Sequence, residues 1–227
     1  IPAIARRQAF AQKIEMPVAR FITGDDVTYS YPVTDDSKWK EIRSDVSWEL
    51  QSFAKYDGYA WYRFHVFLPL AIKTNSLLKD SLRISLARVD DVCEAFFNGT
   101  RIGKAGSFPE EKEGYVSAWN QKQEYHIAAN SGFINWNGEN VISVKVYDGG
   151  GAGGIFSAIP YLNMMDLIDA VTINNHSPVK FNKPGDAKKN IVIENNAAEK
   201  IVGKFNYDII DVENEKTENH SMTVTIP

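Results

Sequence analysis

Apolar and polar residues alternate along several stretches of the chain with the period of two that is typical of half-buried β-strands. Residues 92–97 are apolar except for Glu94 and run into Asn98-Gly99, the dipeptide favoured in two-residue hairpin turns, and Arg101 begins a return strand. The clearest alternation covers residues 60–68 (ending at Pro69), 82–86, 123–127 and 140–147. This pattern predicts an all-β fold, built as a sandwich of antiparallel strands.

The pattern changes toward both ends of the chain. Residues 1–20 have weakly helical apolar spacing and predict an N-terminal arm, whereas residues 21–48 predict short β elements between acid-rich turns. After Tyr161 tryptophan disappears, and about four short alternating runs follow, at residues 171–173, 190–193, 203–210 and 222–226. An immunoglobulin-like sandwich needs about seven strands. We therefore expect a sandwich over residues 21–165 and a truncated immunoglobulin-like β domain over residues 166–227.

Composition excludes some classes of partner. The chain has 25 basic and 29 acidic residues, interleaved along its length, so its formal net charge is only −4. Such a balance predicts neither nucleic acid nor an anionic membrane surface as a partner. The lone Cys93 lies in an apolar run and is expected to be a small buried core residue.

Three phrases resemble a known family. They are Tyr56-Asp57-Gly58-Tyr59-Ala60-Trp61-Tyr62-Arg63, then Val89-Asp90-Asp91 with Phe97-Asn98-Gly99-Thr100-Arg101-Ile102-Gly103, and residues 139–151, which end in Tyr147-Asp148-Gly149-Gly150-Gly151. Together they are similar to the N-terminal sugar-binding domain of glycoside hydrolase family 2 enzymes and to the related domain of sialate O-acetylesterases. The resemblance covers residues 21–162.

That resemblance implies a galactose-binding-like jelly roll followed by an immunoglobulin-like domain. It also implies a secreted, periplasmic or cell-surface protein whose partners are carbohydrate and the catalytic domain of the same full-length protein. In family 2 enzymes a barrel carries the catalytic acids, so chemistry is expected outside this chain.

Sugar recognition by a β-sandwich usually needs an exposed aromatic ring and a few amide or acid groups. Trp119, Tyr115 and Asn120 lie in the polar stretch 108–121, and Tyr56 and Asp57 lie in the turn before a strand. For Trp119 the alternative is a hydrophobic plug beneath the loop. By contrast Trp39, Trp48 and Trp61 lie in strand-like runs and are expected in the core.

Three acids complete the candidate site. Asp90 and Asp91 follow a strand end, and Asp148 precedes the glycine-rich residues 149–154. They could bind sugar hydroxyls, hold a structural calcium ion or cap loop amides, and the glycine loop could form a ligand rim or pack beneath its neighbours. If the three loops share one rim, Trp119 stacks on a sugar while Asp91 and Asp148 accept hydroxyl protons. Apart from that calcium ion, no cofactor is expected.

The function expected from these observations is a non-catalytic accessory segment that binds or frames a glycan. One alternative is a structural spacer that does not contact sugar, and another is a self-contained glycosidase or carbohydrate esterase. Adjacent aspartates on one loop do not provide the two carboxyls across a cleft that glycoside hydrolysis needs, and there is no Gly-x-Ser-x-Gly elbow. The chain alone is therefore not expected to be an enzyme.

Overall fold

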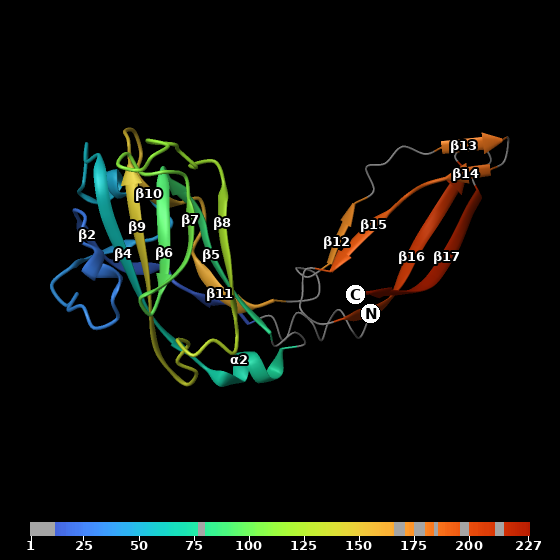
Figure 1. Ribbon diagram of the computed structural model, residues 1–227, viewed down its shortest axis with the longest axis horizontal. Helices are drawn as coiled ribbons and strands as arrows, with labels where there is room; N and C mark the ends of the chain where they lie inside the picture. Colours follow the sequence, from blue (N-terminus) through green and yellow to red (C-terminus); the bar gives the residue numbers. More distant parts are fainter. Residues whose placement is uncertain are drawn as a thin grey trace. The chain divides into compact units, whose positions relative to one another are not determined.

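The chain forms two β-rich units. The computed structural model describes residues 12–76, 80–165, 171–174, 180–183, 186–195, 200–211 and 216–227. Contacts divide the chain into Ile1–Met165 and Asp166–Pro227, and antiparallel strands dominate each unit (Figure 1). The predicted all-β fold is confirmed. In the described part of the chain, no helix has both the length and the apolar character needed to cross a membrane.

The first unit contains a six-stranded antiparallel sheet in the order β3-β2-β4-β9-β6-β7. Its strands are β2 (Val18–Thr23), β3 (Lys40–Arg43), β4 (Gly58–Leu68), β6 (Val92–Phe97), β7 (Thr100–Ala105) and β9 (Gly138–Asp148). The long central pair β4 and β9 is in register from Gly58 opposite Asp148 to Leu68 opposite Gly138. The sequence predicted these two strands from alternation alone, and the structure pairs them along their whole length.

A five-stranded sheet forms the second layer, in the order β1-β11-β5-β10, with β8 also paired to β5. Its strands are β1 (Ile14–Glu15), β5 (Ser81–Asp90), β8 (Lys122–Ala128), β10 (Gly154–Phe156) and β11 (Tyr161–Met164). Three short helical segments connect the strands, namely η1 (Val27–Ser30), η2 (Trp48–Gln51) and α2 (Leu70–Asn75). Pro69 follows β4 and is the N-cap residue of α2, so its missing N–H removes no hydrogen bond of the helix.

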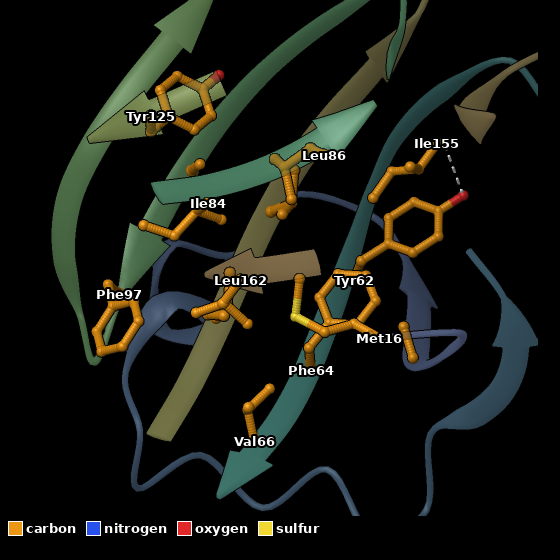
Figure 2. Packing of buried hydrophobic residues seen from close by; sticks show 14 of the residues in the cluster. Met16, Tyr62, Phe64, Val66, Ile84, Leu86, Phe97, Tyr125, Ile155 and Leu162 are labelled. Carbon is orange, nitrogen blue, oxygen red and sulfur yellow. Dashed lines mark hydrogen bonds between the residues drawn. The ribbon is translucent and has the colours of Figure 1, made fainter. Parts of the chain in front are cut away.

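The hydrophobic core lies between the two sheets. Alternate residues of β4, among them Tyr62, Phe64 and Val66, face Ile84 and Leu86 of β5 and Leu162 of β11 (Figure 2). The Tyr62 hydroxyl also accepts a hydrogen bond of 3.3 Å from the Ile155 amide, which fixes β10 beside the core. Cys93 is buried in this core, as expected.

The opposite face of β4 is buried at Trp61 and Arg63, because the segment 24–39 covers it there, whereas His65 and Phe67 are exposed. Trp61 is 1% exposed and packs against Phe96, and Arg63 is fully buried beneath the same segment. Trp48 is also fully buried, whereas Trp39 is only partly buried against Tyr29. The prediction that these tryptophans belong to the core is thus confirmed for Trp48 and Trp61.

Two local predictions have different outcomes. The Asn98-Gly99 turn is confirmed, since both residues have positive φ (47° and 80°) between β6 and β7. The helical arm is wrong for residues 14–20, because β1 pairs with β11 and β2 joins the larger sheet. Met16 and Ala19 are buried there, so tertiary packing outweighs the weak helical spacing. Residues 1–11 lie outside the described residues.

The described residues of the second unit form three antiparallel pairs. These pairs are β12 (Val171–Asn174) with β15 (Val192–Asn195), β13 (Lys180–Lys183) with β14 (Asp186–Lys188), and β16 (Ile201–Asp211) with β17 (Lys216–Ile226). The four runs predicted from the sequence correspond to β12, β15, β16 and β17. An immunoglobulin-like assignment for this unit remains a prediction.

Candidate functional site

Three loops distant in sequence meet at Asp91, at one end of the first unit. Its carboxylate accepts hydrogen bonds from the Gly149 amide (2.9 Å) and from the Ser117 hydroxyl, and its carbonyl accepts the Ala118 amide (2.8 Å). The Ser117 hydroxyl in turn accepts the Trp119 amide (3.3 Å). The predicted proximity of the loop after Val89, the loop containing Trp119 and the glycine loop is confirmed.

The same contacts correct the predicted roles of Asp91 and Asp148. Asp91 is 7% exposed and Asp148 is fully buried, so neither carboxylate can receive a sugar hydroxyl. Burial favours the neutral form of Asp91, but hydrogen bonds from Ser117, Tyr115 and the Gly149 amide outweigh it and lower its pKa. Asp91 therefore remains ionised and caps loop amides, one of the alternatives left open by the sequence.

Tyr56 also has a structural role. The Tyr56 hydroxyl donates to the carbonyl of Tyr59 (2.6 Å), and its ring packs edge-on against Trp48. In contrast, Asp57 and Asn120 are exposed. Neither of these two is among the residues that line the cavity described next.

A surface cavity of about 380 Å³ lies beside the junction of the three loops. Trp119 lines it with half of its surface exposed, so the hydrophobic-plug interpretation is wrong. Asp90 lines it too, and both were predicted site residues. The remaining lining residues are Asp45, Val46, Ser47, Leu50, Ala152, Phe156 and Ser157. We call this cavity the Trp119 pocket.

Tyr115 lies next to this pocket rather than in its lining. It is 45% exposed, and its ring packs edge-on against Tyr147. Its hydroxyl also lies only 2.7 Å from the position that a Cβ at Gly149 would take. A side chain at position 149 would therefore displace Tyr115, which explains the need for glycine there.

Two other surface cavities are less suited to a sugar. One, of about 460 Å³, is lined by Asp36, Arg63 and His65, whose polar atoms already bind one another. Another, of about 660 Å³, belongs to the second unit and is lined mainly by aliphatic and aromatic residues such as Ile191, Phe205 and Met222. Only the Trp119 pocket combines a half-exposed indole with a partly buried carboxyl among the cavities described here.

Asp90 is surrounded by other acids. Burial, a hydrogen bond to Asp91 and the charges of Asp91, Asp148 and Glu49 raise the pKa of Asp90 to about 7. Burial and the charges of Asp91 and Glu49 likewise raise the pKa of Asp148 to about 6, against the opposing hydrogen bond from the Gly150 amide. The pocket therefore holds a carboxyl that titrates near neutral pH, in a negative local potential.

The second oxygens of two of these acids are buried without a hydrogen-bond partner in the described structure, namely Oδ2 of Asp148 and Oε2 of Glu49. Asp148 accepts the Gly150 amide (2.8 Å) and Glu49 accepts the Gly153 amide (3.0 Å) through their other oxygens. Each carboxylate thus holds one end of the glycine loop, and neither is paired with a cation through these contacts.

The described acids are not arranged as calcium ligands, and the possible structural calcium ion stays a prediction. Calcium in proteins takes six to eight oxygen ligands. Both oxygens of Asp91 already accept hydrogen bonds. Over the described residues, no three His, Cys, Asp or Glu side chains are grouped so that they could hold a metal ion.

No family model matches the sequence, and no curated protein is similar to it. The similarity found is one of fold. β-glucuronidase 2 of Bacteroides uniformis, bound covalently to cyclophellitol-6-carboxylate aziridine, superposes with a TM-score of 0.61 at 18% identity. A glycosyl hydrolase family 2 member from Bacteroides cellulosilyticus gives 0.60 at 17%, and a β-glucuronidase of an uncultured Clostridium species gives 0.58 at 15%.

These matches cover most of this chain but a minor part of the others. The superpositions include 95%, 94% and 95% of this chain, and 26%, 29% and 39% of the three solved chains, respectively. At these identities the comparison shows a shared fold of β domains and nothing about substrate. The resemblance to sialate O-acetylesterase domains remains a prediction.

Sequence reasoning missed several residues of the site. Glu49 was not singled out because it lies beside Trp48 in a segment without strand alternation, and Asp45 and Leu50 belong to the same segment. Phe156 could have been found. Gly154-Ile155-Phe156 follows the glycine loop as a short strand, so a buried Ile155 implies that Phe156 points to the opposite face.

Asp90→Asn is expected to make the first unit more stable at pH 8 and to leave its stability near pH 4 unchanged. The folded protein holds the Asp90 proton up to about pH 7, whereas the ordinary pKa is 3.8. Folding stability therefore falls as pH rises from about 4 to about 7 and stays low above it. The full difference would be worth about 4 kcal/mol, and partial solvent exposure reduces the expected gain to about 1–2 kcal/mol.

Urea unfolding followed by tryptophan fluorescence at pH 4, 6 and 8 measures this effect. Asp57→Asn serves as the control, because Asp57 is exposed and does not line the pocket. An unchanged slope of stability against pH in Asp90→Asn would show that Asp90 titrates in its ordinary range.

Proposed function

We propose that this chain is a non-catalytic part of a secreted multidomain glycoside hydrolase. In this proposal the first unit binds or frames a glycan at the Trp119 pocket, and the catalytic domain of the same full-length protein lies outside the chain. The observation that carries the proposal is the combination of a fold shared with part of family 2 glycosidases and a surface pocket that presents an indole beside a carboxyl.

The chemistry of the pocket supports sugar as its ligand. An exposed indole stacks on the apolar face of a pyranose ring, and Leu50 and Phe156 extend that apolar surface. Asp90, Ser47 and Ser157 provide groups that can hydrogen-bond hydroxyls. A pocket of this size accommodates one or two sugar rings rather than a long chain.

A catalytic role has weaker support. Asp45 and Asp90 both line the pocket, and most glycosidases use a pair of carboxyl groups for catalysis. However, both oxygens of Asp45 accept hydrogen bonds from the Arg43 guanidinium (2.9 and 2.7 Å), which lower the pKa of Asp45. A carboxylate held in this way is a poor nucleophile and a poor base.

The test is a titration of galactosides and plant or host oligosaccharides, followed by tryptophan fluorescence and amide chemical shifts. Two or three contacts of about 1 kcal/mol each predict dissociation constants from millimolar to high micromolar. Trp119→Ala should weaken binding at least about fivefold with little change in melting temperature, because half of the side chain is already exposed.

Tyr31→Ala is the matched control. Tyr31 is 48% exposed and does not line the pocket, so its loss should leave binding unchanged. If no sugar shifts any signal at tens of millimolar, or if Trp119→Ala binds like the parent protein, the first unit is a structural spacer. That alternative is favoured by the packing roles of Asp91, Asp148 and Tyr56.

A further inference from the structure

We propose that the Trp119 pocket prefers glycans with a free, protonated amine, such as glucosamine units, and disfavours uronates. This inference rests on the proposed function, because it specifies the class of sugar for the same pocket. It follows from the charges around the pocket and from the type of side chain that lines it.

The unpaired charge among the residues that line the pocket is negative. Asp90 lines the pocket, and Glu49, Asp91 and Asp148 act on it through their charges. The hydrogen bonds described above tie Glu49, Asp91 and Asp148 to backbone amides or neutral hydroxyls, which stabilise an anion without cancelling its charge. A cation placed beside Asp90 therefore gains attraction from several carboxylates in a partly desolvated site.

The basic residues around the pocket do not reverse this sign. Arg43 forms the two-pronged pair with Asp45, so these two charges compensate each other. Lys122 pairs with Glu124 at 2.6 Å on the neighbouring strand β8. Arg88 lies opposite Phe156 in the pairing of β5 with β10, but it is not one of the residues that line the pocket.

The indole of Trp119 acts in the same direction. An aromatic face attracts an ammonium group as well as the apolar face of a sugar, and tryptophan is the strongest of the aromatic side chains in this respect. An amino sugar can thus stack on Trp119 and direct its ammonium toward Asp90. A uronate would place its carboxylate in the same negative potential and gain no cationic partner among the residues that line the pocket.

A matched series of β-1,4-linked trisaccharides tests this preference. Glucosamine, N-acetylglucosamine and glucose trimers differ at carbon 2. A glucuronate-containing oligosaccharide is the negatively charged ligand of the comparison. We expect the glucosamine trimer to bind at least about fivefold more tightly than the others at about pH 7 and low salt, and to lose this advantage in 0.5 M salt.

The pH profile gives a second signature. Binding of the amino sugar should strengthen from pH 5 to about 7, as Asp90 loses its proton. It should weaken again above the pKa of the sugar amine, where the amine loses its own charge. The N-acetyl and glucose trimers carry no charge, and they should show no such maximum.

Two variants locate the effect. Asp90→Asn should remove the preference, so that the glucosamine trimer binds no more tightly than the neutral trimers. Ala152→Lys introduces a cation at an exposed lining position and should shift the preference toward the uronate. Asp57→Asn is the control, since it removes a nearby acid that does not line the pocket.

The outcomes separate the two proposals. Equal or tighter binding of neutral sugars or of the uronate by the parent protein would overturn the amine preference and keep the pocket as a glycan site. A preference that survives in Asp90→Asn would overturn the role of Asp90. Absence of binding for every sugar would overturn the proposed function together with this inference.

Discussion

Replacing Arg63 by methionine is expected to destabilise the first unit by about 3–5 kcal/mol, because it leaves a buried carboxylate without its cation. Arg63 is fully buried, and its Nε donates to Oδ2 of Asp36 at 2.7 Å. Nη1 donates to the carbonyls of Tyr29 (2.6 Å) and Tyr31 (2.8 Å), and Nη2 donates to that of Thr34. Urea unfolding followed by fluorescence measures the loss.

The size of this effect depends on Asp36 as much as on Arg63. Asp36 is 8% exposed and also binds Nε2 of His65 at 2.7 Å. Burial works against its ionised form, but the hydrogen bonds from Arg63 and His65 outweigh burial and lower its pKa. Methionine fills a similar volume and supplies none of these donors, so Asp36 must either remain charged and unpaired or take up a proton.

Arg43→Met is the matched control for Arg63→Met. Arg43 binds Asp45 through two hydrogen bonds, the shorter of which has the same length of 2.7 Å as the Arg63–Asp36 bond. The side chain of Arg43, however, is 65% exposed. A solvated pair of this kind is worth about 0–1 kcal/mol. If the two variants lost the same stability, Arg63 would not be the centre of a buried network, and the cover of segment 24–39 over β4 would rest on the aromatic contacts alone.

The strands and the hairpin were predictable because their signals are local. Alternation in residues 60–68 and 140–147 requires only that one face of a strand meets the core, and Asn98-Gly99 requires only a positive φ. The burial of Arg63 was not predictable in this way. Arg63 occupies a polar position of a strand, and only the fold of segment 24–39 over that face converts it into a buried residue.

The candidate site shows the same division. Sequence composition identified Trp119 and Asp90 as ligand-type residues, and both line the pocket. Sequence could not distinguish them from Asp91 and Asp148, because the difference is whether a neighbouring backbone amide already occupies the carboxylate. For Asp91 the amide belongs to Gly149, 58 residues further along the chain, so no local pattern records it, whereas Asp148 accepts the amide of Gly150 within its own loop.

Gly154→Ala is expected to cost about 2–4 kcal/mol and to weaken glycan binding as well. Gly154 has φ +103°, a region that alanine rarely adopts, and a Cβ there would collide with the Tyr62 hydroxyl and approach Trp48. Tyr62 would have to move away from Ile155, breaking the bond shown in Figure 2. Because Gly154 pairs with Asp90 between β10 and β5, the shift would also displace the edge of the pocket.

Gly151→Ala separates the collision from the backbone strain. Gly151 has nearly the same φ, +105°, but nothing lies within 4 Å of a Cβ built there, so this variant should lose only about 1–2 kcal/mol through the strained φ. Chemical denaturation gives both stabilities, and titration with the preferred sugar gives both affinities. Equal losses of unfolding free energy in the two variants would mean that Tyr62 and Trp48 move aside without destabilising the protein. Because both rings are fully buried in a close-packed core, we expect instead that Gly154→Ala loses more stability and that it alone loses affinity.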